Sequence, residues 1–157
     1  MKEIDKLKEK SISYFCEKPS NFPEGKPFNC CETIIKTLAE QLGIESDLIP
    51  RIGTGIGAGV SLNGLLCGSI SGAAIIIGIK HGRNKPEETP IKTWQMVDDY
   101  IKAFKDKFHY TNCRQLTGVD VKTPEGLKKY FESIHDYSCA ERVKFAVEKT
   151  LEILGEK

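Results

Sequence analysis

An uncharged, glycine-rich stretch occupies the middle of the chain and limits the folds open to it. Residues 52–79 carry no charged side chain although 29% of all residues are charged, and nine of the 14 glycines lie between Gly53 and Gly82. A membrane span needs roughly 20 mainly apolar residues, but here the solidly apolar part, 65–79, is shorter. We therefore interpret the stretch as a central helix that is apolar on all sides because other helices surround it. A membrane helix is the less favoured alternative.

Four further segments have the spacing of amphipathic helices, with apolar residues three and four positions apart. They cover residues 34–42, 94–108, 127–134 and 143–154. Gly43 and Gly155 are typical stop signals for the first and last, and Thr123-Pro124 is a typical start for the third. The stretch up to Phe15 also favours a helix. We expect an all-α fold, a compact helical bundle around the glycine-rich helix, in one domain covering residues 1–157.

Three of the glycines recur every four residues. Gly64, Gly68 and Gly72 are predicted to share one helical face, beside Cys67. Glycine costs a helix about 1 kcal/mol relative to alanine, so we expect close packing or room for a bound group to compensate. The face is equally suited to packing within the chain and to packing on a second subunit, so a homo-oligomer is one possibility.

The segment from Gly53 to Ala58 matches the dinucleotide pattern G-x-G-x-x-G/A by letter. That fingerprint needs a preceding strand and an acidic residue about 20 positions later. Pro50 lies just upstream, however, and no Asp or Glu occurs between Leu48 and Pro86. We interpret these glycines as a flexible or tightly turning segment that leads into the central helix.

Charge and cysteine content indicate the compartment and the class of chemistry. The N-terminal residues MKEIDKLKEK lack the apolar run of an export signal, so we expect a cytoplasmic protein. Lys plus Arg (23) nearly match Asp plus Glu (22), which predicts neither nucleic acid nor a membrane surface as a partner. In a reducing compartment, six cysteines favour metal binding or redox chemistry over structural disulfides.

Three of the cysteines share a local pattern that predicts the start of a helix. Each follows an N-capping residue and precedes a Glu or Gln, as in a capping box; the segments are Asn29-Cys30-Cys31-Glu32, Asn112-Cys113-Arg114-Gln115 and Ser138-Cys139-Ala140-Glu141. The positive end of a helix dipole favours thiolate, the form that binds metal or attacks a disulfide. The alternative is that cysteine is simply tolerated there as a small residue.

Spacing alone gives only a weak metal signal. Cys30, Cys67, Cys113 and Cys139 are separated by 37, 46 and 26 positions, and no C-x-x-C occurs. Zinc ribbons and ferredoxin-type sites usually have short paired spacings. Any shared site must therefore be assembled by the fold.

From about residue 29 to 151 the chain resembles the C_GCAxxG_C_C family of redox-active proteins. The matching pieces are Asn29-Cys30, the glycines 53–59, Cys67-Gly68-Ser69-Ile70-Ser71-Gly72, Gly78-Ile79-Lys80, Asn112-Cys113-Arg114 with Leu116-Thr117-Gly118, and Cys139 with Val143 and Ala146. Ser69 departs from the alanine of the family pattern. The resemblance implies that Cys30, Cys67, Cys113 and Cys139 are the cofactor-binding and metal-binding set, with Cys16 and Cys31 as extras. It extends to the non-haem domain of split-Soret cytochromes, where a similar set is associated with an iron–sulfur centre.

Three mechanisms remain open at this point. The favoured one is an iron–sulfur or other iron centre for electron transfer, held by four thiolates. The second is a metal-free thiol–disulfide oxidoreductase using adjacent Cys30 and Cys31, and the third is a structural zinc site. Each redox mechanism implies a redox partner protein or a small-molecule electron donor or acceptor. No catalytic triad can be drawn, so enzymatic activity is left open.

The three histidines are not expected to be ligands. His81 and His109 follow predicted helices, where a cation suits the negative end of the dipole. His135 lies near the end of the third amphipathic segment. We expect a capping or surface role for each.

Overall fold

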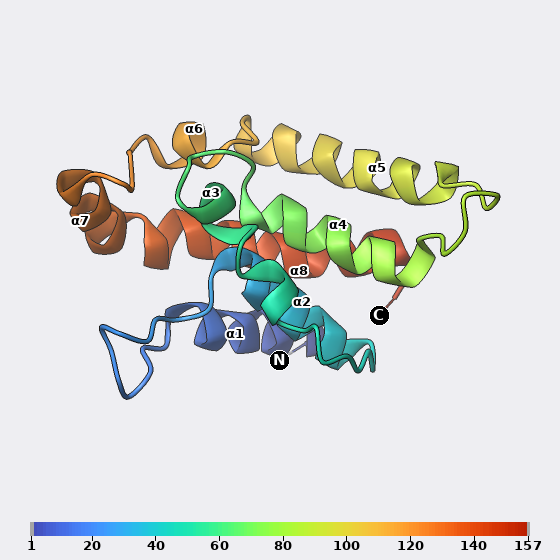
Figure 1. Ribbon diagram of the computed structural model, residues 1–157, viewed down its shortest axis with the longest axis horizontal. Helices are drawn as coiled ribbons and strands as arrows, with labels where there is room; N and C mark the ends of the chain where they lie inside the picture. The colour runs from blue at the N-terminus through green and yellow to red at the C-terminus, as the bar shows by residue number, and fades with distance from the viewer. Residues whose placement is uncertain (1, 157) are drawn as a thin grey trace.

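The computed structural model describes residues 2–156, which form a helical bundle (Figure 1). In chain order the elements are α1 (Glu3–Cys16), α2 (Cys30–Gln41), the 3-10 turn η1 (Arg51–Gly53), α3 (Gly57–Ser61), α4 (Gly68–His81), α5 (Ile91–Phe108), α6 (Cys113–Thr117), α7 (Pro124–Ser133), the π-helical turn η2 (His135–Cys139) and α8 (Ala140–Leu154). Within the described residues the only β pairing is an isolated bridge between Leu66 and Asn112. The predicted all-α class is confirmed.

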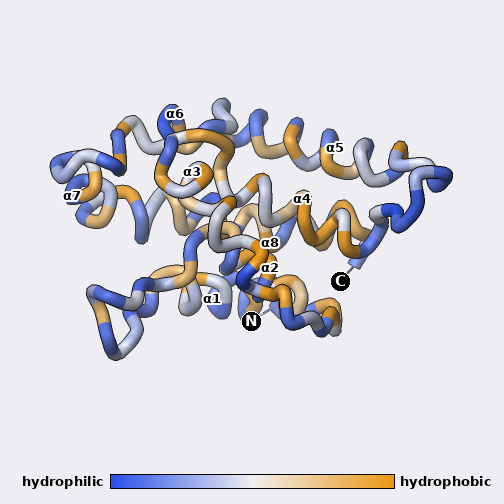
Figure 2. The backbone as a smooth tube through the Cα atoms, in the orientation of Figure 1, coloured by the Kyte–Doolittle hydropathy of each residue, from blue (hydrophilic) through white to orange (hydrophobic). Residues whose placement is uncertain are grey.

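Helix α4 is the buried centre of the bundle, as predicted. It packs against α2, α5 and α8, and Figure 1 shows it between α5 and α2. Ile70, Ala73, Ile76 and Ile77 on this helix are at most 1% exposed. In Figure 2, α4 is hydrophobic or neutral along most of its length and hydrophilic only near its C-terminal end. Across residues 2–156, no helix combines the length and apolar character that crossing a membrane requires.

The glycine pattern is only partly a feature of α4. Gly68 and Gly72 lie in the helix, but Gly64 precedes it in a left-handed conformation with φ of 71°. A Cβ added at Gly72 would lie 3.0 Å from Cβ of Ile34 in α2. The predicted close approach therefore occurs within the chain, between α4 and α2, and it involves two of the three glycines.

Helix α5 forms where predicted, but one residue of its apolar stripe does not enter the core. Tyr100 and Phe104 are fully buried, whereas Trp94 is 62% exposed. The neighbouring hydroxyl of Thr93 donates a hydrogen bond to the carbonyl of His81 at the end of α4. Because adjacent helix positions face different directions, a turn that points Thr93 toward α4 leaves Trp94 toward solvent.

Candidate functional site

The fold brings the four cysteines of the sequence prediction to one place. All four line a narrow cavity of about 20 Å³. Cys30 and Cys113 are the first residues of α2 and α6, Cys67 immediately precedes α4, and Cys139 ends η2 just before α8. Four segments that are distant in sequence thus contribute one thiol each.

A short backbone pairing places Cys67 beside Cys113. The N–H of Cys67 donates to the carbonyl of Thr111 at 2.9 Å, and the N–H of Cys113 donates to the carbonyl of Leu65 at 2.6 Å. These bonds flank the antiparallel bridge between Leu66 and Asn112. The pairing holds the segment before α4 against the segment before α6. It therefore fixes the sulfurs of Cys67 and Cys113 relative to each other.

Two glycines allow backbone to approach the sulfurs closely. A Cβ at Gly68 would lie 2.2 Å from Sγ of Cys30, and a Cβ at Gly59 would lie 2.6 Å from Cβ of Cys113. Neither position has room for a side chain without movement of its neighbours. At both positions the lack of a side chain is what permits this packing.

Residues 58–62 form a left-handed turn beside the cavity, which Ala58 lines. Five successive residues have φ between 52° and 70°, and four of them are not glycine. Left-handed helical conformation costs roughly 1–2 kcal/mol per L-residue, and such strain is concentrated at functional sites. The turn directs the backbone N–H of Ala58 at the sulfur of Cys30. The left-handed turn begins at Ala58, where the predicted turning segment 53–58 ends, and Ala58 lines the cavity.

The sulfurs of Cys67 and Cys139 also receive hydrogen bonds. The backbone N–H of Ser69 donates to Cys67, whereas the buried Ser69 hydroxyl makes no hydrogen bond to any described residue. The guanidinium of Arg142 lies 3.1 Å from Sγ of Cys139, although Arg142 itself is only 5% exposed. The serine that departs from the family pattern therefore places an unpaired hydroxyl in the cavity lining. Together, the amides of Ala58 and Ser69 and the guanidinium of Arg142 stabilise negative charge on three of the four sulfurs.

Burial, rather than the helix dipole, dominates the proton affinity of these thiols. Desolvation raises the pKa of Cys30 well above its usual value, and nearby Cys67 raises it further. Desolvation also raises the pKa of Cys67, and raises that of Cys113 to about 11. Of the three cysteines expected to start helices as thiolates, the expectation is wrong for Cys30 and Cys113 in the metal-free protein. A metal ion would have to displace their protons.

The predicted capping pattern holds completely at only one of the three sites. Asn29 and Glu32 form the expected capping box at the start of α2. Asn112 precedes α6, but its side chain makes no capping hydrogen bond. Ser138 lies inside η2, so Cys139 is not the first residue of α8. The reason is that the π-helical turn continues the helical backbone through the position where the sequence predicts a cap.

The four sulfurs are spaced more widely than the ligands of one metal ion. Among the described residues, Cys16, His135 and Asp136 each offer a metal-ligand atom within 4.8 Å of the other two. No three of the cavity sulfurs lie that close to one another. One tetrahedral zinc ion with Zn–S bonds of about 2.3 Å would hold its sulfurs about 3.8 Å apart. The cavity therefore suits a larger, polynuclear group better than a single ion.

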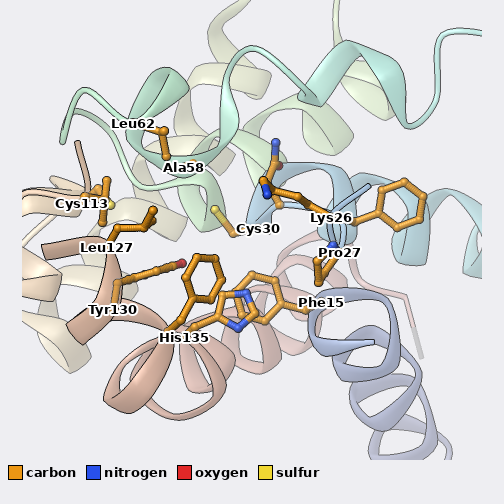
Figure 3. A pocket seen from close by; sticks show the side chains of 14 residues that line it. Phe15, Lys26, Pro27, Cys30, Ala58, Leu62, Cys113, Leu127, Tyr130 and His135 are labelled. Atoms are coloured by element: carbon orange, nitrogen blue, oxygen red, sulfur yellow. The ribbon is translucent and has the colours of Figure 1, made fainter. Parts of the chain in front are cut away.

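A second cavity of about 140 Å³ lies beside the first (Figure 3). Cys30 and Cys113 line both cavities, as do Ala58 and Tyr130. The remaining walls of the larger cavity are mostly apolar or aromatic, and Figure 3 shows His135 and Phe15 side by side along one of them. Two of the four cysteines are thus reached from this larger space.

His135 does not have the expected surface or capping role. It is 7% exposed and stacks on Phe15, with ring centroids 4.1 Å apart. His81 is the last residue of α4 and His109 is the C-capping residue of α5, as predicted. Cys16, which the sequence prediction sets aside, lies close to His135. The sequence carries no local signal for this pairing, because Cys16 and His135 come together only through tertiary packing of α1 and η2.

Comparison with known proteins supports the cysteine pattern. Residues 28–153 match the family model described as "Putative redox-active protein (C_GCAxxG_C_C)". Neither the curated proteins nor the solved structures gave a match to the chain. The family match spans all four cavity cysteines.

Proposed function

Because the chain belongs to the C_GCAxxG_C_C family of redox-active proteins, we propose that Cys30, Cys67, Cys113 and Cys139 hold an iron–sulfur cluster for electron transfer. The observation that carries this proposal is the convergence of four thiols from four separate segments on one buried cavity. Iron–sulfur clusters need four such ligands. When bound, the cluster would supply one-electron redox chemistry.

The surrounding residues suit a negatively charged group. The backbone amides of Ala58 and Ser69 donate to cavity sulfurs, and Arg142 adds a full positive charge at Cys139. Hydrogen bonds to sulfur, net charge and solvent exposure set the reduction potential of a cluster. These donors favour the reduced, more negative state and so raise the potential.

The metal-free alternative is less well supported by the geometry. Cys30 lines the cavity, whereas Cys31 is 0% exposed and does not line it. Adjacent helix positions do not face each other. Desolvation raises the pKa of Cys31 to about 11, so neither thiol is an effective nucleophile near neutral pH.

The larger cavity offers an electron donor or acceptor a route to the site. Its apolar and aromatic lining reaches Cys30 and Cys113, and Lys26 is among its residues. A small molecule, or the prosthetic group of a partner protein, would come within short range of two sulfurs there. This arrangement supports electron exchange on the side of α7 and η2.

Anaerobic reconstitution with iron and sulfide tests the proposal. We expect brown protein with iron and acid-labile sulfide in equal amounts, and a reversible one-electron couple. Cys30→Ser should lose most of the iron, whereas the matched control Cys31→Ser at the adjacent position should retain it. Colourless protein with a two-electron thiol couple would support the oxidoreductase alternative, and redox-silent zinc would support a structural site.

A further inference from the structure

A second cluster of ligand atoms lies where the end of α1 meets the start of η2. Cys16 ends α1, and His135 and Asp136 begin η2. One ligand atom from each residue lies within 4.8 Å of the other two. None of the three residues lines the four-cysteine cavity, so this group is a separate feature of the molecule.

The imidazole of His135 is held in a fixed orientation. Its ring stacks on Phe15 with an interplanar angle of 18°, and Tyr130 lies edge-on at 5.5 Å between ring centroids. Its Nδ1 is 2.5 Å from Oδ1 of Asp136. An imidazole held in place by aromatic packing is preorganised for binding.

The thiol and the carboxylate are also paired. Burial, together with the nearby Asp136 carboxylate to which the Cys16 thiol hydrogen-bonds, raises the pKa of Cys16 to about 11. The carboxylate thus lies close to both Cys16 and His135. A divalent cation would bind one ligand atom of each residue and displace the thiol proton of Cys16.

We propose that Cys16, His135 and Asp136 form a Zn²⁺ site, independent of the four-cysteine cavity. Thiolate, imidazole and carboxylate are all common zinc ligands, whereas Ca²⁺ and Mg²⁺ prefer oxygen alone. The charges of Zn²⁺, one thiolate and one carboxylate sum to zero. This neutrality limits the repulsion of the nearby cations, Lys18 and Lys144, which act on Asp136 and Cys16 respectively.

The site has room for a fourth ligand. Cys16, His135 and Asp136 line a cavity of about 210 Å³, together with Lys18, Phe22, Pro27 and Phe131. Three protein ligands and one open position are typical of zinc sites that bind water or substrate. Bound zinc would tie the end of α1 to the turn that carries Cys139.

Titration with Co²⁺ alone tests the site, because Co²⁺ replaces Zn²⁺ and absorbs visible light. The background is the Cys30→Ser/Cys113→Ser variant, which lacks two cavity thiols. We expect it to bind one Co²⁺ per chain, with a thiolate-to-cobalt charge-transfer band that Zn²⁺ abolishes. Adding Cys16→Ser should remove the band, and adding Cys31→Ser should leave it. A background variant without the band, or a band that survives Cys16→Ser, overturns the proposal.

Alkylation of the unaltered chain gives a second test if the background variant does not fold. One equivalent of Zn²⁺ beyond any metal in the four-cysteine site should slow alkylation of Cys16 about tenfold or more, as measured by peptide mass spectrometry. Asp136→Asn should reduce this protection. Equal rates with and without Zn²⁺ overturn the proposal. Both readouts concern Cys16, so failure of the iron–sulfur proposal would leave them unchanged.

Discussion

The absence of a Cβ atom at Gly68 allows α4 to approach the start of α2 closely. A Cβ there would lie 2.2 Å from Sγ of Cys30 and 2.9 Å from the backbone N of Cys31, whereas one at Gly78 in the same helix would meet nothing within 4 Å. We expect Gly68→Ala to destabilise the protein by about 1–3 kcal/mol and to lower iron content. Gly78→Ala should be neutral or stabilise it by up to about 1 kcal/mol. Urea unfolding of both variants checks this, and equal effects would contradict the packing argument.

Arg142 is the charged residue at the candidate site, and it should tune the potential. We expect Arg142→Met to make the reduction potential of the reconstituted protein more negative, because the cation and its hydrogen bond to Cys139 are lost. A differential interaction of about 1 kcal/mol corresponds to about 40 mV for one electron. Arg142→Lys keeps the charge and should shift it less. Redox titration measures the potential, and an unchanged value in Arg142→Met would contradict a role of Arg142 in setting it.

At the scale of residues, sequence reasoning finds donors that follow local patterns and misses those made by packing. Asn29 caps α2 as its position predicts. Arg142 contacts Cys139 from three positions along the helix, a spacing at which side chains meet, whereas the sequence gives no indication that His135 becomes buried beside Cys16. His135 lies in the π-helical turn, whose hydrogen-bond register no local pattern of residues predicts.

Helices α1 and α2 are joined by a charge cluster around Glu40. Partial burial disfavours its charged form, but hydrogen bonds from Lys10, Lys36 and Tyr14 outweigh this and hold the pKa of Glu40 at about 2, below the ordinary 4.5. The folded-state pKa is depressed, so this stabilisation is present above pH 4.5 and is lost as the pH falls toward 2.

The variant Glu40→Gln tests this contribution. Because the cluster is partly exposed, we expect a loss of only about 0.5–1 kcal/mol at pH 7. The difference from the unaltered protein should shrink below pH 4.5 and vanish near pH 2. Urea unfolding across this range measures it, and a difference independent of pH would rule out the charge cluster as its source.

At the scale of elements, periodicity predicts the long helices well and irregular segments poorly. Helices α2, α5, α7 and α8 all form on the predicted segments. Their apolar stripes are local properties of the sequence. The left-handed turn at residues 58–62 contains Val60, which disfavours positive φ. That turn exists only because the surrounding helices and the chain pairing at Leu66 hold it.

On the scale of the whole molecule, metal binding and folding should be coupled. The four proposed ligands come from four segments, so the unfolded chain contains no preformed site. We expect the reconstituted protein to unfold about 10 °C or more above the metal-free protein. Calorimetry under anaerobic conditions measures both, and identical transition temperatures would contradict four-cysteine ligation.

The one-domain prediction is tested by the shape of the same transition. Helix α4 packs on α2, α5 and α8, so loss of any one of these contacts exposes the common core. We expect the metal-free protein to unfold in a single transition whose calorimetric and van't Hoff enthalpies agree. Two separated transitions would indicate independent units. The sequence predicts the central helix that makes this core continuous, but not which helices contact it.

The order of the cysteines along the chain bears on biosynthesis. Cys139 comes after α1 to α7, and the cavity has its fourth wall only when the turn before α8 is in place. During translation, Cys30, Cys67 and Cys113 leave the ribosome before Cys139 has been synthesised. If the four thiols hold the proposed cluster, they can bind iron and sulfide together only after nearly the entire polypeptide has been synthesised.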